Sequence, residues 1–268
     1  MESDLPAVDS DRTLDTTTTT LNIIEKLKDL NGSTITELAN KLDITKGCVH
    51  NHLSTLYQHD YVIKDRGEYR LSPKFILVGE HVRQENLLHQ FGKKELDNLI
   101  EETGEYGQLV TETHGFGTVI YLSRGEKAIG EDYPDHMKKK PLYLHHTAAG
   151  KSILAHSPEE HVNDVIERYD LFERTENTIT ERERFYEELA EVRERGYAYN
   201  EEEEVVGLKA IGAPIFGPNE SVIGAISLSG PRSRMKGERY REELPSKVVD
   251  TAEVIEVNIN MHHKTNEF

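Results

Sequence analysis

The sixteen residues from Ile44 to His59 contain no Asp or Glu, in a chain with 49 acidic and 32 basic side chains. A carboxylate beside closely spaced phosphates would oppose binding, so this composition suits contact with a polyanion. A helix through the stretch would place small and polar residues on one outer face. These residues are Gly47, Asn51, Ser54 and Gln58, with Lys46, His50 and Thr55 beside them. The chemistry indicated is hydrogen bonding to base edges in the major groove of DNA.

Basic side chains follow this stretch on a predicted hairpin. The segments "YVIK" and "EYRLS" indicate two short strands around the turn "DRG". Their Lys and Arg side chains could hold the DNA backbone or enter the minor groove. The residues expected to contact DNA are therefore Thr45, Lys46, Gly47, His50, Asn51, Ser54, Lys64, Arg66 and Arg70.

Two further helices must position this surface. Apolar residues recur at helical spacing from Leu21 until Asn31-Gly32 ends the pattern, and the threonines at 16–20 indicate a tail and helix cap. Thr34 and Glu37 have capping-box spacing at the start of the second helix. The buried side of the third helix would consist of Val49, Leu53 and Leu56. This order predicts a winged helix-turn-helix over residues 16–74, after a flexible tail at 1–15.

Two other interpretations of this domain stay open. Any three-helix domain has a polar face that could lack acid by chance, and the same fold also serves for protein contact. A metabolite-binding enzyme or sensor could use it only for dimerisation. The small, polar outer face argues against that use, because a dimer surface would favour apolar residues.

Beyond a linker helix predicted at 75–91, the chain alternates between strands and helices. Strands are predicted in "YGQLVTE", "GTVIYLS", "LKAIGAPIF" and "VIGAISLSG". Helical patterns cover Ala148–His156, Pro158–Tyr169, Thr180–Arg195 and Tyr240 to about His262. Thr180 and Glu183 have capping-box spacing, and Gly196 marks the end of that helix. Residues 92–265 therefore predict a separate α+β domain.

The formal charge is −17, and the acidic residues lie mainly in the second domain. Residues 1–75 hold 9 basic and 12 acidic side chains (net −3), whereas residues 76–268 hold 23 and 37 (net −14). Such acidity without Trp is typical of a halophile, whose salt would screen long-range repulsion from DNA. The single cysteine, Cys48, excludes an intramolecular disulfide, and no run of eighteen apolar residues or basic signal region occurs. We expect a cytoplasmic protein that does not contact membranes.

Three ordered motifs after the winged helix resemble the IclR family of transcription regulators. They are "HHTAAGKSILAH", "LAEVRERGYAYNEEEEVVGLKAIGAPIF" and "VIGAISLSGP", preceded by "TELANKLDITKGCVHNHLSTLYQHDYV" and "YRLS". The resemblance implies an α+β protein of two domains, a winged helix-turn-helix joined by a linker helix to a GAF-like effector-binding domain. It further implies a repressor or activator that binds a palindromic operator in double-stranded DNA as a homodimer or homotetramer. Its effector would be a small molecule, commonly a carboxylate or aromatic acid.

The resemblance also implies where that effector binds. Ala148 and Ala149 match residues whose backbone N–H groups hold the effector's carboxylate, and unpaired N–H groups at a helix start favour anions in general. Ser227 and Ser229 match serines of the last strand, and their spacing of two places both hydroxyls on one sheet face. The effector is therefore expected to be anionic, an organic or sugar-derived acid.

Three positions depart from the family pattern. Asn200 stands where a member with a known pocket has Asp, and Ala210 stands where that member has Cys. An amide can donate as well as accept, and a methyl group can do neither, so the ligand can differ from glyoxylate- or pyruvate-like acids. Asn51 occupies a position that is often Arg, so the operator sequence cannot be transferred from relatives.

Carboxylates are missing from the segments that hold most of these positions. The acid-free windows are 136–158, 205–219 and 221–237. We interpret them as exclusion of acid from an anionic effector's cavity, for the Coulombic reason that also applies to the DNA-facing helix. The alternative is that buried strands lack acid in every protein. The "MKKK" at 137–140, which we expect to be exposed, fits the first interpretation better.

Other motifs give weaker signals. "AAGKS" ends like a P-loop, but His145 stands where that pattern needs Gly. His145-His146, near His136 and His156, could hold a metal; adjacent histidines point to different sides of a strand, so we expect none, although zinc stays open. Glu201–Glu204 indicates a solvated turn. No nucleophile, base and orienting group can be assembled, so we expect no cofactor and no enzyme activity.

Overall fold

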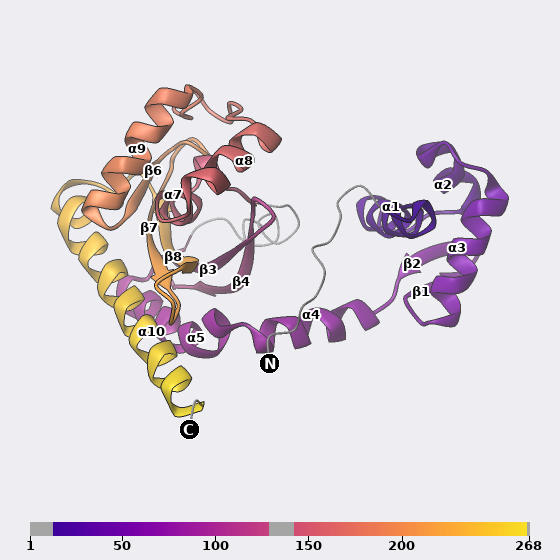
Figure 1. Cartoon of the computed structure of the whole chain (residues 1–268), viewed down its shortest axis with the longest axis horizontal. Helices are drawn as coiled ribbons and strands as arrows, with labels where there is room; N and C mark the ends of the chain where they lie inside the picture. Colours follow the sequence, from indigo (N-terminus) through magenta and orange to yellow (C-terminus); the bar gives the residue numbers. More distant parts are fainter. Residues whose placement is uncertain (1–12, 129–141, 267–268) are drawn as a thin grey trace. The chain divides into compact units, whose positions relative to one another are not determined.

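The computed structural model describes residues 13–128 and 142–266. These residues fall into two compact units, one ending at Val82 and one beginning at Arg83 (Figure 1). Each unit has its own hydrophobic core.

The first unit contains three helices and a hairpin, in the predicted order. The elements are α1 (Asp15–Leu30), α2 (Ile35–Leu42), α3 (Lys46–Gln58), β1 (Val62–Asp65) and β2 (Glu68–Leu71). Apolar faces of the helices and hairpin meet in one core, which includes Ile23, Leu27, Leu38, Val49, Leu53 and Tyr69. The order of elements is that of a winged helix-turn-helix.

The ends of the first two helices agree only in part with the prediction. The threonines at 16–20 are helical instead of forming a tail and cap, and the hydroxyls of Thr19 and Thr20 donate to backbone carbonyls four residues earlier, which satisfies these hydroxyls within the helix. Asn31 ends α1 with a left-handed φ of 53°, as expected. Thr34 caps α2 by accepting from the N–H of Glu37 at 3.2 Å, but the Glu37 carboxylate accepts from the Ser33 hydroxyl instead of completing the capping box.

Two helices occupy the region where one linker helix is predicted. These are α4 (Lys74–Glu85) and α5 (Leu87–Thr103). Asn86 separates them, because its extended backbone interrupts the helix and its Oδ1 accepts from the N–H of Leu88 at 2.9 Å. Helix α4 buries none of its residues, whereas α5 packs into the core of the second unit.

The second unit is built on a six-stranded antiparallel sheet in the order β5-β4-β3-β8-β7-β6. The strands are β3 (Tyr106–Thr113), β4 (Phe116–Arg124), β5 (Leu142–Tyr143), β6 (Ala198–Glu201), β7 (Leu208–Phe216) and β8 (Val222–Pro231). The four longest strands coincide with the predicted segments. Strands β5 and β6 have two and four residues, too few for a sequence period to reveal them.

Helices cover both faces of this sheet (Figure 1). Helix α5 and the last helix, α10 (Leu244–Asn266), pack on one face around Leu96, Leu109, Ile226 and Ile255. The other side carries a 3-10 turn (Leu144–His146) and the helices α7 (Ala148–Ala155), α8 (Glu159–Tyr169) and α9 (Arg182–Arg195). A π-helical turn (Arg239–Glu243) leads into α10.

The predicted start of α9 was wrong, and its predicted end is confirmed. The helix begins at Arg182 with Glu181 at the cap position and no side-chain cap, so Thr180 and Glu183 do not form a capping box. The Thr180 to Glu183 spacing matched by chance. Gly196 ends the helix with a φ of 82°, a left-handed conformation that costs glycine nothing.

A buried ion pair links the residue before β3 to the segment before α10. Glu105 has a fully buried side chain and accepts hydrogen bonds from Arg234 at 2.6 and 2.9 Å and from Arg239 at 3.0 Å. Burial alone would raise the pKa of Glu105, but these hydrogen bonds outweigh it and hold the pKa below its usual range. The carboxylate therefore stays charged and ties the two segments together.

Candidate nucleic-acid interface and ligand site

The outer face of α3 is accessible and free of acid. Thr45 caps the helix, with its Oγ1 accepting from the N–H of Cys48 at 3.2 Å. The three apolar residues predicted to face inward, Val49, Leu53 and Leu56, are buried. Residues of the predicted contact set on the outer side are exposed, namely Thr45, Lys46, Gly47, His50 and Asn51. The face that α3 can present to a polyanion therefore carries hydrogen-bond donors and one cation, Lys46.

Ser54 is less accessible than the rest of the predicted contact set. It is half-buried, and its Oγ lies 3.5 Å from the Nδ1 of His50. A neighbouring hydroxyl, that of Thr55, donates to the Asn51 carbonyl at 3.1 Å, so it is also occupied by the helix itself. We therefore expect Lys46, His50 and Asn51 to reach a groove more readily than Ser54.

The three cations of the hairpin differ in their freedom. Arg66 and Gly67 form its two-residue turn with φ of 48° and 91°, which places the Arg66 side chain at the exposed tip. Lys64 lies over the Tyr69 ring, 5.1 Å from its centroid. Arg70 pairs with Glu68 at 3.2 Å, so part of its charge is already neutralised. Arg66 is the cation best placed to meet a phosphate.

The six residues predicted to bind an effector gather in one region of the second unit. Strand register places Asn200, Ala210 and Ser229 in one row across β6, β7 and β8. Ser227 lies two residues from Ser229 and therefore on the same face. Its neighbour in the register, Gly212, contacts the start of α7 so closely that an added Cβ would lie 2.6 to 2.8 Å from the backbone of Ala148 and Ala149. The sheet row and the helix start thus share one site.

Both polar atoms of the Asn200 side chain are already engaged. Its Nδ2 donates to the His146 carbonyl at 2.8 Å, and its Oδ1 accepts from the N–H of Glu203 at 2.9 Å. Asn200 therefore holds the segment before α7 against the loop after β6. Its role here is first to position these two segments, which the sequence did not indicate.

Three buried polar atoms of two side chains in this region lack hydrogen-bond partners among the described residues. His146 is 3% exposed and neither ring nitrogen is bonded, while Gln108 Oε1 is unbonded on β3 opposite Ser227. Burial, with help from nearby cations, lowers the pKa of His146 to about 3, so the ring is neutral and offers one donor and one acceptor. A bound ligand could supply the missing partners.

The predicted geometry of the histidine pair was wrong. His145 and His146 lie in a 3-10 turn instead of a strand, both are buried, and their ring centroids are 4.6 Å apart. His145 uses Nε2 to contact the Phe172 carbonyl at 3.0 Å. His136 and the "MKKK" segment lie outside the described residues. Within the described ranges, no group of three or more His, Cys, Asp or Glu side chains is arranged to hold a metal.

The glutamate run after β6 is not a solvated turn. Glu202 and Glu203 are buried, and the Glu203 carboxylate accepts from the ammonium group of Lys151 at 2.6 Å. Lys151, from the "AAGKS" segment, is 1% exposed and also pairs with Glu188 of α9 at 3.3 Å. The loop turns inward because it neutralises a buried cation. A lysine in an otherwise apolar helix was the available sequence signal for such a partner.

Acidic groups are not wholly excluded from the predicted effector region. Burial raises the pKa of Glu204 to about 7, and Arg174 opposes this rise. Burial also raises the pKa of Tyr106, and the nearby Glu204 raises it further. Tyr106 lies opposite Ser229 in the sheet. A carboxyl group therefore borders the site, in a form that can be neutral near pH 7.

No helix among the described residues is both long and apolar enough to cross a membrane.

Family models match most of the chain. A model described as the IclR helix-turn-helix domain matches residues 18–66. A second model, Bacterial transcriptional regulator IclR C-terminal, matches residues 82–257.

Individual proteins extend this similarity over both units. A probable HTH-type transcriptional regulator, ArcR of Halobacterium salinarum, is 37% identical over 240 residues, covering 89% of this chain and 91% of its own length. The transcriptional repressor IclR of Escherichia coli is 30% identical over 233 residues, covering 83% and 82%. Among solved structures, the Thermotoga maritima IclR is 25% identical with a TM-score of 0.70, covering 92% of this chain and 100% of that one.

Proposed function

The chain belongs to the IclR family of DNA-binding transcriptional regulators with an effector-binding C-terminal domain, and from this premise we propose that it binds a palindromic operator under the control of a small anionic metabolite. The observation that carries the proposal is the exposed, acid-free outer face of α3. The relatives of this chain are transcriptional regulators and not enzymes, in agreement with the expectation from the sequence that it has no enzyme activity. Because such an operator lies on chromosomal DNA, the protein would act in the cytoplasm.

The proposed DNA contacts combine base reading with backbone contact. Lys46, His50 and Asn51 would face base edges in the major groove, where a helix of this kind reads sequence. Arg66, at the tip of the hairpin, would contact phosphate without reading sequence. Thr45, Gly47, Ser54, Lys64 and Arg70 complete the proposed surface.

The proposed effector is an organic or sugar-derived acid bound between the start of α7 and the row of β6, β7 and β8. Ala148 and Ala149 are the first residues of α7, where backbone N–H groups have no partner within the helix and favour a carboxylate. Ser227 and Ser229 would contact its polar substituents, and the small side chain of Ala210 lies between Ser229 and Asn200 in the strand register. The protein would need two states that differ in operator affinity. Binding of the acid would then alter operator affinity if the acid binds one of these states more tightly than the other.

Replacement of Ser229 by Leu should remove the response to the effector and leave operator binding within about twofold of wild type, because the larger side chain fills the site in the second unit and leaves every residue of the DNA-binding unit unchanged. The measurement is operator affinity with and without added pyruvate, glyoxylate or gluconate, after a screen has identified a responsive acid. Ser246→Leu, at an exposed position of α10, is the matched control and should respond normally. An intact response in the Ser229 variant would contradict the assigned site.

We further propose that a second copy of the chain covers the apolar surface of α4. Four of its side chains are strongly exposed: Ile76 at 71%, Leu77 at 73%, Val78 at 45% and Val82 at 61%. A palindromic operator presents two equal half-sites, so a regulator that binds both needs two copies related by symmetry. Such an apolar set is unfavourable in water and suits a self-complementary contact.

Val78→Glu combined with Val82→Glu should halve the mass in solution, because four carboxylates would meet across the pair of helices. Operator affinity should fall by at least about tenfold, since each copy would then bind a half-site alone. Analytical ultracentrifugation and a binding titration measure the two effects. The control, Gly79→Glu, adds acid at an exposed position on the side of α4 that carries none of these four apolar residues, and should keep the wild-type mass. An unchanged mass in the first variant would exclude α4 as the interface.

A further inference from the structure

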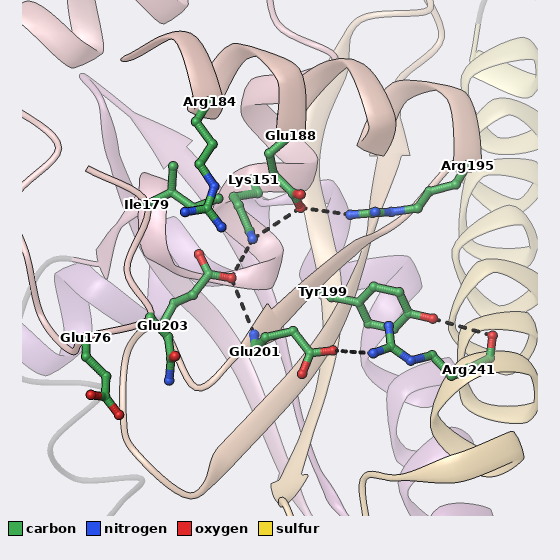
Figure 2. A pocket seen from close by; sticks show the side chains of 11 residues that line it. Lys151, Glu176, Ile179, Arg184, Glu188, Arg195, Tyr199, Glu201, Glu203 and Arg241 are labelled. Atoms are coloured by element: carbon green, nitrogen blue, oxygen red, sulfur yellow. Dashed lines mark hydrogen bonds and ion pairs between the residues drawn. The ribbon is translucent and has the colours of Figure 1, made fainter. Parts of the chain in front are cut away.

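A pocket distinct from the proposed effector site lies between α7, the loop before α9, α9, β6 and the π-helical turn before α10 (Figure 2). Its volume is about 410 Å³, within the range of small-molecule sites. None of the residues proposed to bind the effector lines it. Eight of its eleven lining residues are charged, four of them cationic and four acidic.

Most of these charges neutralise one another. Glu188 accepts from both Lys151 at 3.3 Å and Arg195 at 2.8 Å, and Glu201 pairs with Arg241 at 3.1 Å. These pairs hold α7, α9, β6 and the segment before α10 together as the pocket wall. They leave little capacity for a ligand, so the groups outside them decide what the pocket can bind.

One carboxylate oxygen in the wall is buried without a partner. Glu203 Oε1 accepts from Lys151 and from the N–H of Glu201, at 2.6 and 3.3 Å, whereas Oε2 has no hydrogen bond to any residue that the structure describes. The Glu203 side chain is 4% exposed. An unpaired buried acceptor is costly, and a ligand with an N–H donor would satisfy it.

One cation of the wall is also uncommitted. Arg184 forms no ion pair within the described part of the chain, although it lies on an acidic helix. Figure 2 shows its guanidinium group directed into the pocket, towards the carboxyl group of Glu203. Glu176, on the opposite side of the pocket in this view, is likewise without an ion-pair partner among described residues. The free groups are therefore one cation on one side and carboxylate acceptors on the other.

We propose that this pocket binds a free α-amino acid, with its carboxylate on Arg184 and its ammonium group on Glu203. A guanidinium group matches a carboxylate with two parallel hydrogen bonds, and an ammonium group supplies the donor that Glu203 Oε2 lacks. A ligand with only negative charge would face Glu203, Glu188 and Glu176. A ligand with only positive charge would face Lys151 and Arg184. A zwitterion meets neither repulsion.

An occupant of this pocket would contact the structure that frames the effector site. The backbone N–H of Glu203 donates to Asn200, and Asn200 donates to the carbonyl of His146 directly before α7. The amino acid would therefore act on the same segments as the proposed carboxylate effector, from a separate position. The inference goes beyond the proposed function and does not depend on it.

The test is to titrate the full-length protein with each of the twenty L-amino acids and to follow thermal unfolding and calorimetric binding. At least one should bind with one site per chain. Its deaminated acid and its decarboxylated amine should each bind at least tenfold more weakly. Arg184→Ala should weaken binding at least tenfold, whereas Arg182→Ala, on the same helix but paired with Glu167, should not change it.

Two further variants separate this site from the effector site. Glu203→Gln should weaken binding of the amino acid, and its unfolding curve shows whether the variant is folded. Ser229→Leu should bind the amino acid as the wild type does. The proposal is overturned if no amino acid binds, if the deaminated acid binds equally well, or if Arg184→Ala has no effect. Unchanged binding in Ser229→Leu would show that the amino acid does not occupy the effector site, whereas loss of binding there combined with normal binding in Arg184→Ala would overturn the proposal.

Discussion

Lys46→Glu combined with Asn51→Glu should lower operator affinity by at least about 100-fold. The variant should then occupy no discrete sites on the genome. Each base contact of this kind is worth roughly 1 to 3 kcal/mol, and each new carboxylate would also lie close to phosphates. Both residues are exposed on the outer face of α3, so their replacement should leave the domain folded. The measurements are genome-wide occupancy of the tagged protein and an operator titration at fixed salt.

The matched control is Asn22→Glu with Lys28→Glu, which makes the same change of charge at exposed positions of α1. This control should keep its discrete sites, with a small loss of affinity at low salt from the added charge. Equal loss of binding in both variants would assign the effect to net charge instead of the α3 surface. Retention of discrete sites in the α3 variant would contradict the proposed DNA contact.

Lys151→Met should destabilise the second unit by about 3 to 5 kcal/mol, the cost of breaking a buried ion pair on one side. Met keeps most of the lysine's length and volume, so the change isolates the lost charge. Glu203 and Glu188 would remain at 4% and 18% exposure without their shared cation. Burial already raises the pKa of Glu203, and Lys151 opposes this rise, so proton uptake by Glu203 would limit the loss.

Equilibrium unfolding in denaturant measures this effect. Adding Glu203→Gln to Lys151→Met should recover part of the lost stability, because the uncompensated carboxylate is removed. Lys247→Met, which breaks the exposed pair with Glu102, is the control and should cost under about 1 kcal/mol. A loss in Lys151→Met no larger than in this control would show that the buried pair contributes little.

Regular periodic segments were predictable from the sequence. The buried residues of α3, the glycine stop after α9 and the four long strands follow from local patterns that depend on few distant contacts. Strands β5 and β6 were not predictable, because two to four residues are too few to show the alternation of apolar and polar residues that marks a strand. The start of α9 was not predictable either. A Thr and a Glu at capping-box spacing form a cap only if the helix begins between them, and the spacing alone does not show that.

The candidate sites were predictable only where local pattern or family resemblance fixed them. Exposure on α3 followed from helix geometry, and strand register brings Asn200, Ala210 and Ser229 together as the resemblance implied. The partnership of Lys151 with Glu203 joins residues 52 positions apart, and no local pattern reveals which acid meets a buried lysine. A run of four glutamates is usually exposed to solvent. Here the contact with Lys151 directs Glu203 into the protein, where it lines the pocket.

The two hydrogen bonds of the Asn200 side chain limit how this protein can evolve. Only a group that donates to the His146 carbonyl and accepts from the Glu203 N–H can take its place without loss. An Asp here would set a carboxylate oxygen against that carbonyl unless the segment before α7 moved. We therefore expect position 200 and the residues around 146 to change together across descendants, and a single Asn200→Asp exchange to be rare.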